Sequence, residues 1–132
     1  MRLLGAVPFL LIVPSAAVSG GSAPPSIDEQ GARHGQALAA ARICPGARTT
    51  AKIDELAASI PPDRRPEFNA ASDRIVAAWN EAFACQDVDP AQYPREINSC
   101  RKSKILSCST TWSEIGPEGS ALPGLLEFAP ED

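Results

Sequence analysis

The segment CRKSKILSC, residues 100–108, places Cys100 and Cys108 on either side of three basic residues. Cysteines in such a segment could bind a metal ion, exchange electrons with another thiol, or form structural disulfides. Structural zinc sites and thiol–disulfide exchange enzymes usually carry a CxxC motif, and covalent haem attachment uses CxxCH. The chain has four cysteines and neither motif. We therefore expect Cys44, Cys85, Cys100 and Cys108 to form structural disulfides, with no metal and no cofactor.

The basic residues of this segment leave one alternative open. Arg101, Lys102 and Lys104 could stabilise a thiolate and so lower the pKa of a neighbouring cysteine. A thiol-active factor or enzyme that uses the Cys100–Cys108 segment is therefore the alternative to a structural role. The simpler interpretation is that the three cations are solvated near the C-terminal end of a helix, where the helix dipole favours positive charge.

Catalysis by a nucleophile would need a positioned base, and His34 is the only histidine of the chain. It lies on the apolar face of a predicted helix, which indicates a packed, hydrogen-bonded side chain rather than a catalytic base. The sequence has no G-x-S-x-G motif. Its close acidic pairs, Asp54–Glu55 and Asp87/Asp89, are typical of a solvated helix face and a turn. We therefore predict no catalytic residues and no enzymatic activity.

Residues 112–119, WSEIGPEG, join a large aromatic side chain to an acidic loop rich in glycine and proline. Aromatic side chains anchor protein interfaces, and a rigid loop loses little entropy on binding. Candidate residues for binding a partner protein are Trp112, Glu114, Pro117 and Glu118. The alternative is that Trp112 covers the hydrophobic core.

The N-terminal residues MRLLGAVPFLLIVPSAAVSGG have the pattern of a secretory signal peptide. Arg2 is followed by an apolar run too short to span a bilayer and then by small residues, which predicts cleavage after Ser19 or Gly20. We therefore assign residues 1–20 to a signal peptide, 21–26 to a linker and 27–132 to one domain. An exported chain meets an oxidising environment, which favours disulfide formation.

Charge and composition limit the partners of the mature protein. After loss of Arg2 its net charge would be −5, which argues against nucleic acids and anionic membrane surfaces as main partners. No second apolar run is long enough for membrane insertion after signal cleavage. The chain is rich in alanine, arginine and proline and poor in lysine, a composition typical of a GC-rich bacterial genome. We expect a periplasmic or secreted protein.

Hydrophobic periodicity predicts three main helices that position the cysteines. Ser26 and Glu29 form a capping box before the first helix, which should span 27–43. Two glycines four residues apart on this helix either permit close approach of another helix or simply weaken it. A second helix is expected from Thr49 or Thr50 to the proline pair 61–62.

The third helix is predicted from about Asp63 to Cys85 or Gln86, with Trp79 in the middle of its apolar stripe and therefore largely buried. A shorter helix should begin at Pro94. Beyond Lys104 apolar and polar residues alternate, so that an extended segment competes with continued helix. The tail from residue 115 is too rich in glycine and proline for a helix. Its leucines indicate that part of it packs across the helices.

These elements predict a small, single-domain, all-α fold stapled by disulfides, with three main helices, a short fourth element and a packed irregular C-terminal tail. If the first and third helices are parallel, Cys44 and Cys85 lie near the same end of the domain. The returning chain then favours Cys85–Cys100 and Cys44–Cys108. The alternative is Cys44–Cys85 with Cys100–Cys108. A straight helix would hold the Cα atoms of Cys100 and Cys108 about 12 Å apart, whereas a disulfide needs roughly 4.4–6.8 Å.

The function that the sequence favours is that of a small exported binding or accessory protein without chemistry of its own, acting on a protein partner that the sequence does not identify. The thiol-active factor or enzyme described above is the first alternative. A structural or stress-protective envelope protein is the second.

Overall fold

The computed structural model describes residues 24–128, and residues 1–23 and 129–132 lie outside the described part. The predicted signal peptide, residues 1–20, therefore falls outside the described residues. So do the first three residues of the predicted linker 21–26.

The described chain is mostly helical, with four α-helices, two short strands and two disulfides, so that the predicted all-α, disulfide-stapled fold class is confirmed. In chain order the elements are α1 (Ile27–Ile43), β1 (Ala47–Thr49), α2 (Lys52–Ala58), the 3-10 turn η2 (Pro62–Arg64), α3 (Arg65–Ala82), the 3-10 turn η3 (Cys85–Asp87), α4 (Pro94–Ile115) and β2 (Leu126–Phe128).

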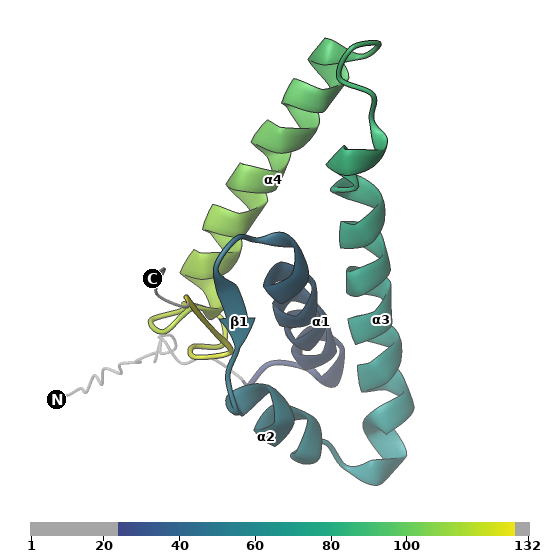
Figure 1. Cartoon of the computed structure of the whole chain (residues 1–132). Coiled ribbons are helices and arrows are strands. Elements are labelled where there is room, and N and C mark those ends of the chain that lie inside the picture. The colour runs from purple at the N-terminus through teal and green to yellow at the C-terminus, as the bar shows by residue number, and fades with distance from the viewer. Residues whose placement is uncertain (1–23, 129–132) are drawn as a thin grey trace, which may run out of the picture.

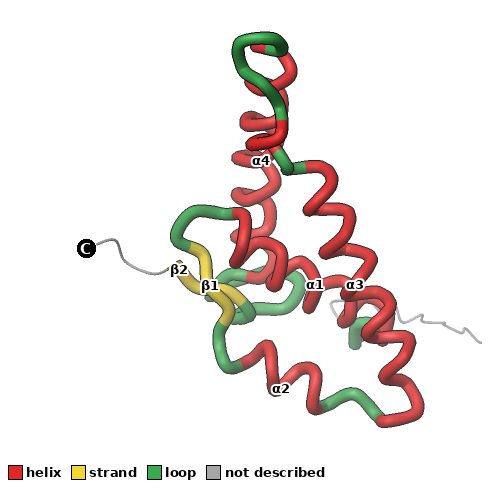
Figure 2. Tube along the Cα trace, turned by 45° about the vertical axis from the view of Figure 1, so that its right-hand side comes forward, coloured by secondary structure: helices red, strands yellow, loops and turns green. Residues whose placement is uncertain are grey.

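Three long helices set the shape of the molecule. Figure 1 shows α3 and α4 joined at one end by a loop and diverging toward the other end, with α1 between them. In Figure 2 the ribbon of β1 and β2 lies to one side of α1, and α2 lies below it. Because α2 and its flanking turns carry the chain back along α1, α1 and α3 are parallel. Helix α4 then returns antiparallel to both.

Glycine and alanine residues of α1 bring it into close contact with α3. Gly31 and Gly35 are buried directly against the backbone of α3, where a methyl group on Gly35 would overlap the carbonyl oxygen of Ser72. The close approach that this glycine spacing allows is therefore confirmed. Three alanines of α1 are also fully buried: Ala37, Ala39 and Ala40. Leu38 is 36% exposed, because the face of α1 that packs inward is formed by the glycines and alanines.

The main hydrophobic core lies where α1, α2, the end of α4 and the tail meet. Its members are Ala37, Ala40, Cys44, Ile53, Ile115, Leu125 and Leu126. Trp79 of α3 is partly buried and packs against this core, as its place on the apolar stripe of the third helix indicated. The buried residues of α3 are Phe68, Ala71 and Ser72, and the two glycines of α1 pack directly against them.

Helix α4 corrects the expectation of a short fourth element. It has 22 residues against 18 in α3, so it is the longest helix in the described chain. The alternating segment after Lys104 is helical because its tertiary contacts follow helical spacing. Cys108 is bonded to Cys44, Thr111 is 1% exposed and Ile115 is fully buried. Positions 108, 111 and 115 lie on one face of a helix.

The C-terminal tail packs on the helices, as its leucines indicated. Leu125 and Leu126 are buried in the core. The chain then forms β2, which pairs antiparallel with β1, with Thr49 opposite Leu126 and Ala47 opposite Phe128. This ribbon was not predicted, because strands of three residues leave no periodic pattern in the sequence.

The contact between Gly35 and Ser72 generates a stability prediction. Gly35→Ala should lower the free energy of unfolding by about 1–3 kcal/mol, the usual cost of adding volume to a tightly packed interface. This loss should appear although alanine is the better helix former by about 1 kcal/mol. Urea denaturation, followed by circular dichroism, measures the difference.

Ala77→Gly is the matched control, because Ala77 is exposed in the middle of α3 and its substitution reports the helix preference alone. If Gly35→Ala raised stability by the amount that Ala77→Gly lowers it, α1 and α3 would not be in close contact.

Candidate functional site

The two disulfides join Cys44 to Cys108 and Cys85 to Cys100, with Cα–Cα distances of 5.8 Å and 5.7 Å. This is the pairing that the chain directions favoured. The alternative bond between Cys100 and Cys108 is absent, because both residues lie within the continuous helix α4. All four cysteines are bonded in the described chain, so this form has no thiolate for the basic residues of α4 to stabilise.

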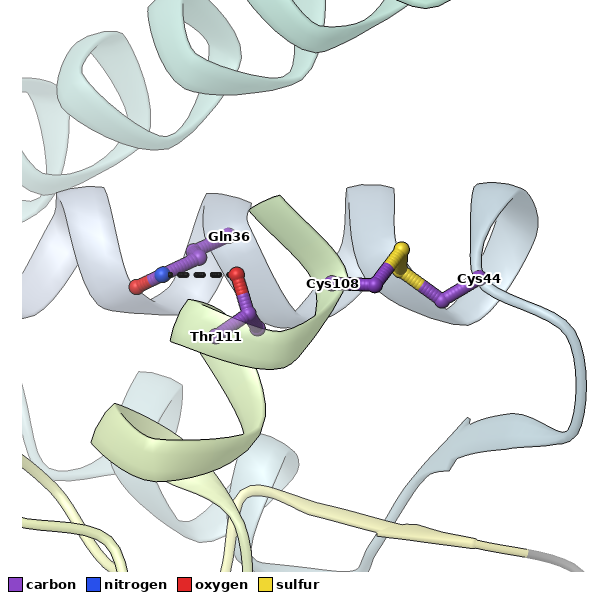
Figure 3. The surroundings of a disulfide bond; sticks show 4 residues. All are labelled: Gln36, Cys44, Cys108 and Thr111. Atoms are coloured by element: carbon purple, nitrogen blue, oxygen red, sulfur yellow. Dashed lines mark hydrogen bonds between the residues drawn. A yellow bond between two sulfur atoms is a disulfide. The ribbon is translucent and has the colours of Figure 1, made fainter. Parts of the chain in front are cut away.

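The Cys44–Cys108 disulfide connects the end of α1 to the middle of α4, and polar contacts continue from it along the same interface. Figure 3 shows the disulfide beside a hydrogen bond that the side-chain amide of Gln36 donates to the hydroxyl of Thr111, at 3.0 Å. Gln36 also donates to Glu114, at 2.9 Å. The position of α4 against α1 is thus fixed by one covalent bond and a half-buried hydrogen-bond network.

The structure does not bring the four predicted partner-binding residues together on one exposed surface. Glu114 is directed toward α1, where it accepts a hydrogen bond from Arg33 at 3.0 Å. Trp112 is half-buried against the ring of Phe128, with 4.2 Å between ring centroids. Only Pro117 and Glu118 are exposed. Trp112 therefore packs on Phe128 at the end of β2.

His34 lies between α1 and α3 as a packing residue. Its Nδ1 atom is 2.8 Å from the hydroxyl of Ser72, and its ring is 4.9 Å from that of Phe68. Burial lowers the pKa of His34 below its ordinary value of 6.5, while the carboxylates of Asp54 and Asp73 oppose this effect. A histidine beside a serine can act as a general base. Here the serine is 4% exposed, so a substrate could not reach its hydroxyl.

The acidic pair Asp54–Glu55 is exposed on α2, and Asp87 and Asp89 are exposed around the turn that follows η3. Within residues 24–128, no group of three or more histidine, cysteine, aspartate or glutamate side chains is arranged to hold a metal ion. No helix of the described chain combines the length and hydropathy needed to cross a membrane.

An open groove of about 510 Å³ lies between α4, the turn that follows α1 and the end of β2, and we call it the α4 groove. Its apolar lining comes from Pro45, Ile105, Phe128 and the Cys44–Cys108 disulfide. Its two charged residues, Arg101 and Lys104, are both basic. Ile105 is 67% exposed and Phe128 is 46% exposed, which places large apolar side chains in contact with water.

A second cleft, of about 220 Å³, lies where the C-terminal ends of α1 and α3 approach α4, and we call it the polar cleft. Arg42, Asn80, Gln86 and Lys104 contribute hydrogen-bond donors to it. None of its lining residues, all of which belong to the described chain, is acidic. The polar cleft is therefore suited to an anion.

Neither cleft contains any of the four residues predicted to bind a partner, although the sequence holds a signal for the α4 groove. Arg101, Lys104, Ile105 and Cys108 follow the spacing i, i+3, i+4, i+7, which places them on one face if residues 94–115 form a single helix. The alternation of apolar and polar residues beyond Lys104, which favours an extended segment, conceals this common face in the sequence.

Comparison of the chain with protein-family models, with curated protein sequences and with solved structures finds no match.

The environment of His34 predicts how stability depends on pH. The pKa of His34 is lower in the folded chain than in the unfolded chain, so unfolding takes up a proton at acidic pH. The contribution of neutral His34 to stability should be fully present above pH 6.5 and should be lost as the pH falls below 6.5. Urea unfolding between about pH 5 and pH 8, the range in which histidine titrates, measures this dependence.

His34→Gln is the control, because glutamine can still hydrogen-bond to Ser72 but does not titrate. The stability difference between wild type and variant should decrease as the pH falls through this range. A difference that grows toward acidic pH would contradict the account, because it would mean that Asp54 and Asp73 stabilise a charged His34.

Proposed function

We propose that this chain is a small exported, disulfide-bonded binding or accessory protein, that it performs no chemistry of its own, and that the α4 groove is its binding surface. The observation that carries the proposal is the exposure of Ile105 and Phe128 in an open groove. Exposed apolar side chains that gather in a groove, unlike scattered ones, mark sites of interaction.

The scarcity of large apolar residues supports this interpretation of the α4 groove. Only 5% of the residues are aromatic, and the buried contact between α1 and α3 is made largely by glycine and alanine. A domain with so little large apolar material would be expected to bury Ile105 and Phe128. A bound ligand or partner that covers them gives a reason for their position at the surface.

Export is supported by the N-terminal pattern of residues 1–20 and by the disulfides. Two disulfides in a small domain are typical of oxidising compartments. A bacterial periplasm or the extracellular medium is therefore the proposed site of action. The absence of chemistry is supported by the burial of Ser72 beside His34 and by the involvement of the four cysteines in disulfides.

The proposal is tested by capture from the native cell-envelope extract. Immobilised mature protein should retain a protein or small molecule that mass spectrometry identifies, and Ile105→Glu should abolish retention because it places a charge in the apolar part of the α4 groove. The exported protein itself should lack its first 19 or 20 residues, the cleavage that the N-terminal pattern predicts.

Lys102→Glu is the matched control, because Lys102 is exposed on α4 and lines neither the α4 groove nor the polar cleft. Both variants should melt within a few degrees of wild type, since the altered side chains are exposed. Retention that survives Ile105→Glu, or that Lys102→Glu abolishes equally, would refute the α4 groove as the binding surface.

A further inference from the structure

The α4 groove and the polar cleft are neighbours that share one residue. Lys104 lines both, and the consecutive residues Ile43 and Cys44 line the polar cleft and the α4 groove respectively. An apolar surface and a set of hydrogen-bond donors thus meet at the half-buried side chain of Lys104. This arrangement matches a ligand with an apolar body at one end and a polar head group at the other.

The charges of this region specify the sign of the head group. Arg42, Arg101 and Lys104 are the charged residues of the two clefts, and all are basic although the whole chain has a net charge of −4. None of the three takes part in an ion pair between residues 24 and 128. Asn80 and Gln86 add neutral donors at the same place. An anionic head group would complement these donors.

The dimensions of the α4 groove favour a small ligand over a membrane or a protein segment. Its volume of about 510 Å³ lies within the range of roughly 300–1,000 Å³ that is usual for small-molecule sites. An anionic membrane surface would be repelled by the net negative charge of the mature chain. A protein segment would need a larger apolar surface than the one formed here by Ile105, Pro45, Phe128 and the disulfide.

We propose that the α4 groove and the polar cleft together bind one single-chain anionic amphiphile of the free fatty acid class. The carboxylate lies in the polar cleft, where Arg42 and Lys104 neutralise its charge. The aliphatic chain lies along Ile105 and the Cys44–Cys108 disulfide and ends at Phe128. This inference rests on the proposed function and names the ligand class of the same surface.

The two tryptophans of the chain provide separate reporters for the two ends of the ligand. Trp112 is in contact with Phe128 of the α4 groove, with 4.2 Å between ring centroids. Trp79 is in contact with Phe83 of the polar cleft, with 5.0 Å between ring centroids. The Trp79→Phe variant therefore keeps only Trp112, which lies near the proposed aliphatic chain. The Trp112→Phe variant keeps only Trp79, which lies near the proposed carboxylate.

The experiment is a titration of the mature protein with dodecanoate below its micellar concentration, followed by calorimetry and tryptophan fluorescence. One dodecanoate should bind per chain. The emission of Trp112 should shift to shorter wavelength in the Trp79→Phe variant, because the aliphatic chain excludes water from Phe128 and from the Trp112 ring in contact with it. Acetate, which has the head group alone, should give no shift. Dodecyltrimethylammonium, which carries the opposite charge on the same chain, should bind at least about tenfold more weakly.

Variants separate the contributions of the two ends. Lys104→Glu and Ile105→Glu should each weaken dodecanoate binding at least about tenfold, since the first reverses the charge at the carboxylate and the second places a charge beside the aliphatic chain. Lys102→Glu, the control on the same helix, should leave binding within about twofold of wild type. Anionic phospholipid vesicles should not bind the wild-type protein.

Three results would overturn the inference: equal binding of dodecanoate and dodecyltrimethylammonium, equal effects of Lys102→Glu and Lys104→Glu, or no binding of dodecanoate at all. If dodecanoate failed to bind while a protein from the envelope extract was captured in an Ile105-dependent manner, this ligand class would be wrong and the proposed function would stand. Vesicle binding that depends on Lys104, without binding of free dodecanoate, would indicate a membrane surface instead.

Discussion

The disulfide between Cys44 and Cys108 is the constraint on which the arrangement of the molecule depends. Helix α4 contacts α1 through Cys108 and the residues that follow it. The N-terminal half of α4 is held by the second disulfide, which joins Cys100 to Cys85 in the turn after α3. A bond between residues 64 positions apart stabilises a fold by about 4 kcal/mol in the chain-entropy model, which is large for a domain with a thin core. The same bond forms part of the α4 groove. The feature that stabilises the fold therefore also builds the candidate site.

The small residues of α1 determine how closely α3 packs against it, as the disulfide determines the position of α4. Because Gly31 and Gly35 allow α3 to approach closely, the contact between the two helices buries mainly backbone and small side chains, together with the ring of Phe68. Other large apolar residues lie at the junction with α2, α4 and the tail, where Ile53, Ile115, Leu125 and Leu126 belong to the core. Ile105 and Phe128 line the α4 groove. The exposure of Ile105 and Phe128 thus follows from how this chain distributes a limited supply of large apolar residues.

How well a feature could be predicted from the sequence depends on whether neighbouring residues or distant segments determine it. The bounds of α1 were predicted correctly because its cap at Ser26 and its end at Cys44 are determined by neighbouring residues. The disulfide pairing followed from helix directions, which short connections constrain. The length of α4 was wrong because contacts of Thr111 and Ile115 with distant segments override the local alternation. The candidate site was missed for the same reason, since Arg101, Lys104 and Ile105 share a surface only when α4 is continuous.

Peptide mapping of the unreduced, exported protein tests this account most directly. Trypsin cleaves after Arg101, Lys102 and Lys104, so it separates Cys100 from Cys108 and makes every pairing distinguishable by mass spectrometry. The account predicts one linked pair of peptides containing Cys44 and Cys108 and another containing Cys85 and Cys100. A linked pair containing Cys100 and Cys108 would contradict it, because α4 could not then be a continuous helix and the α4 groove would not exist in the form described.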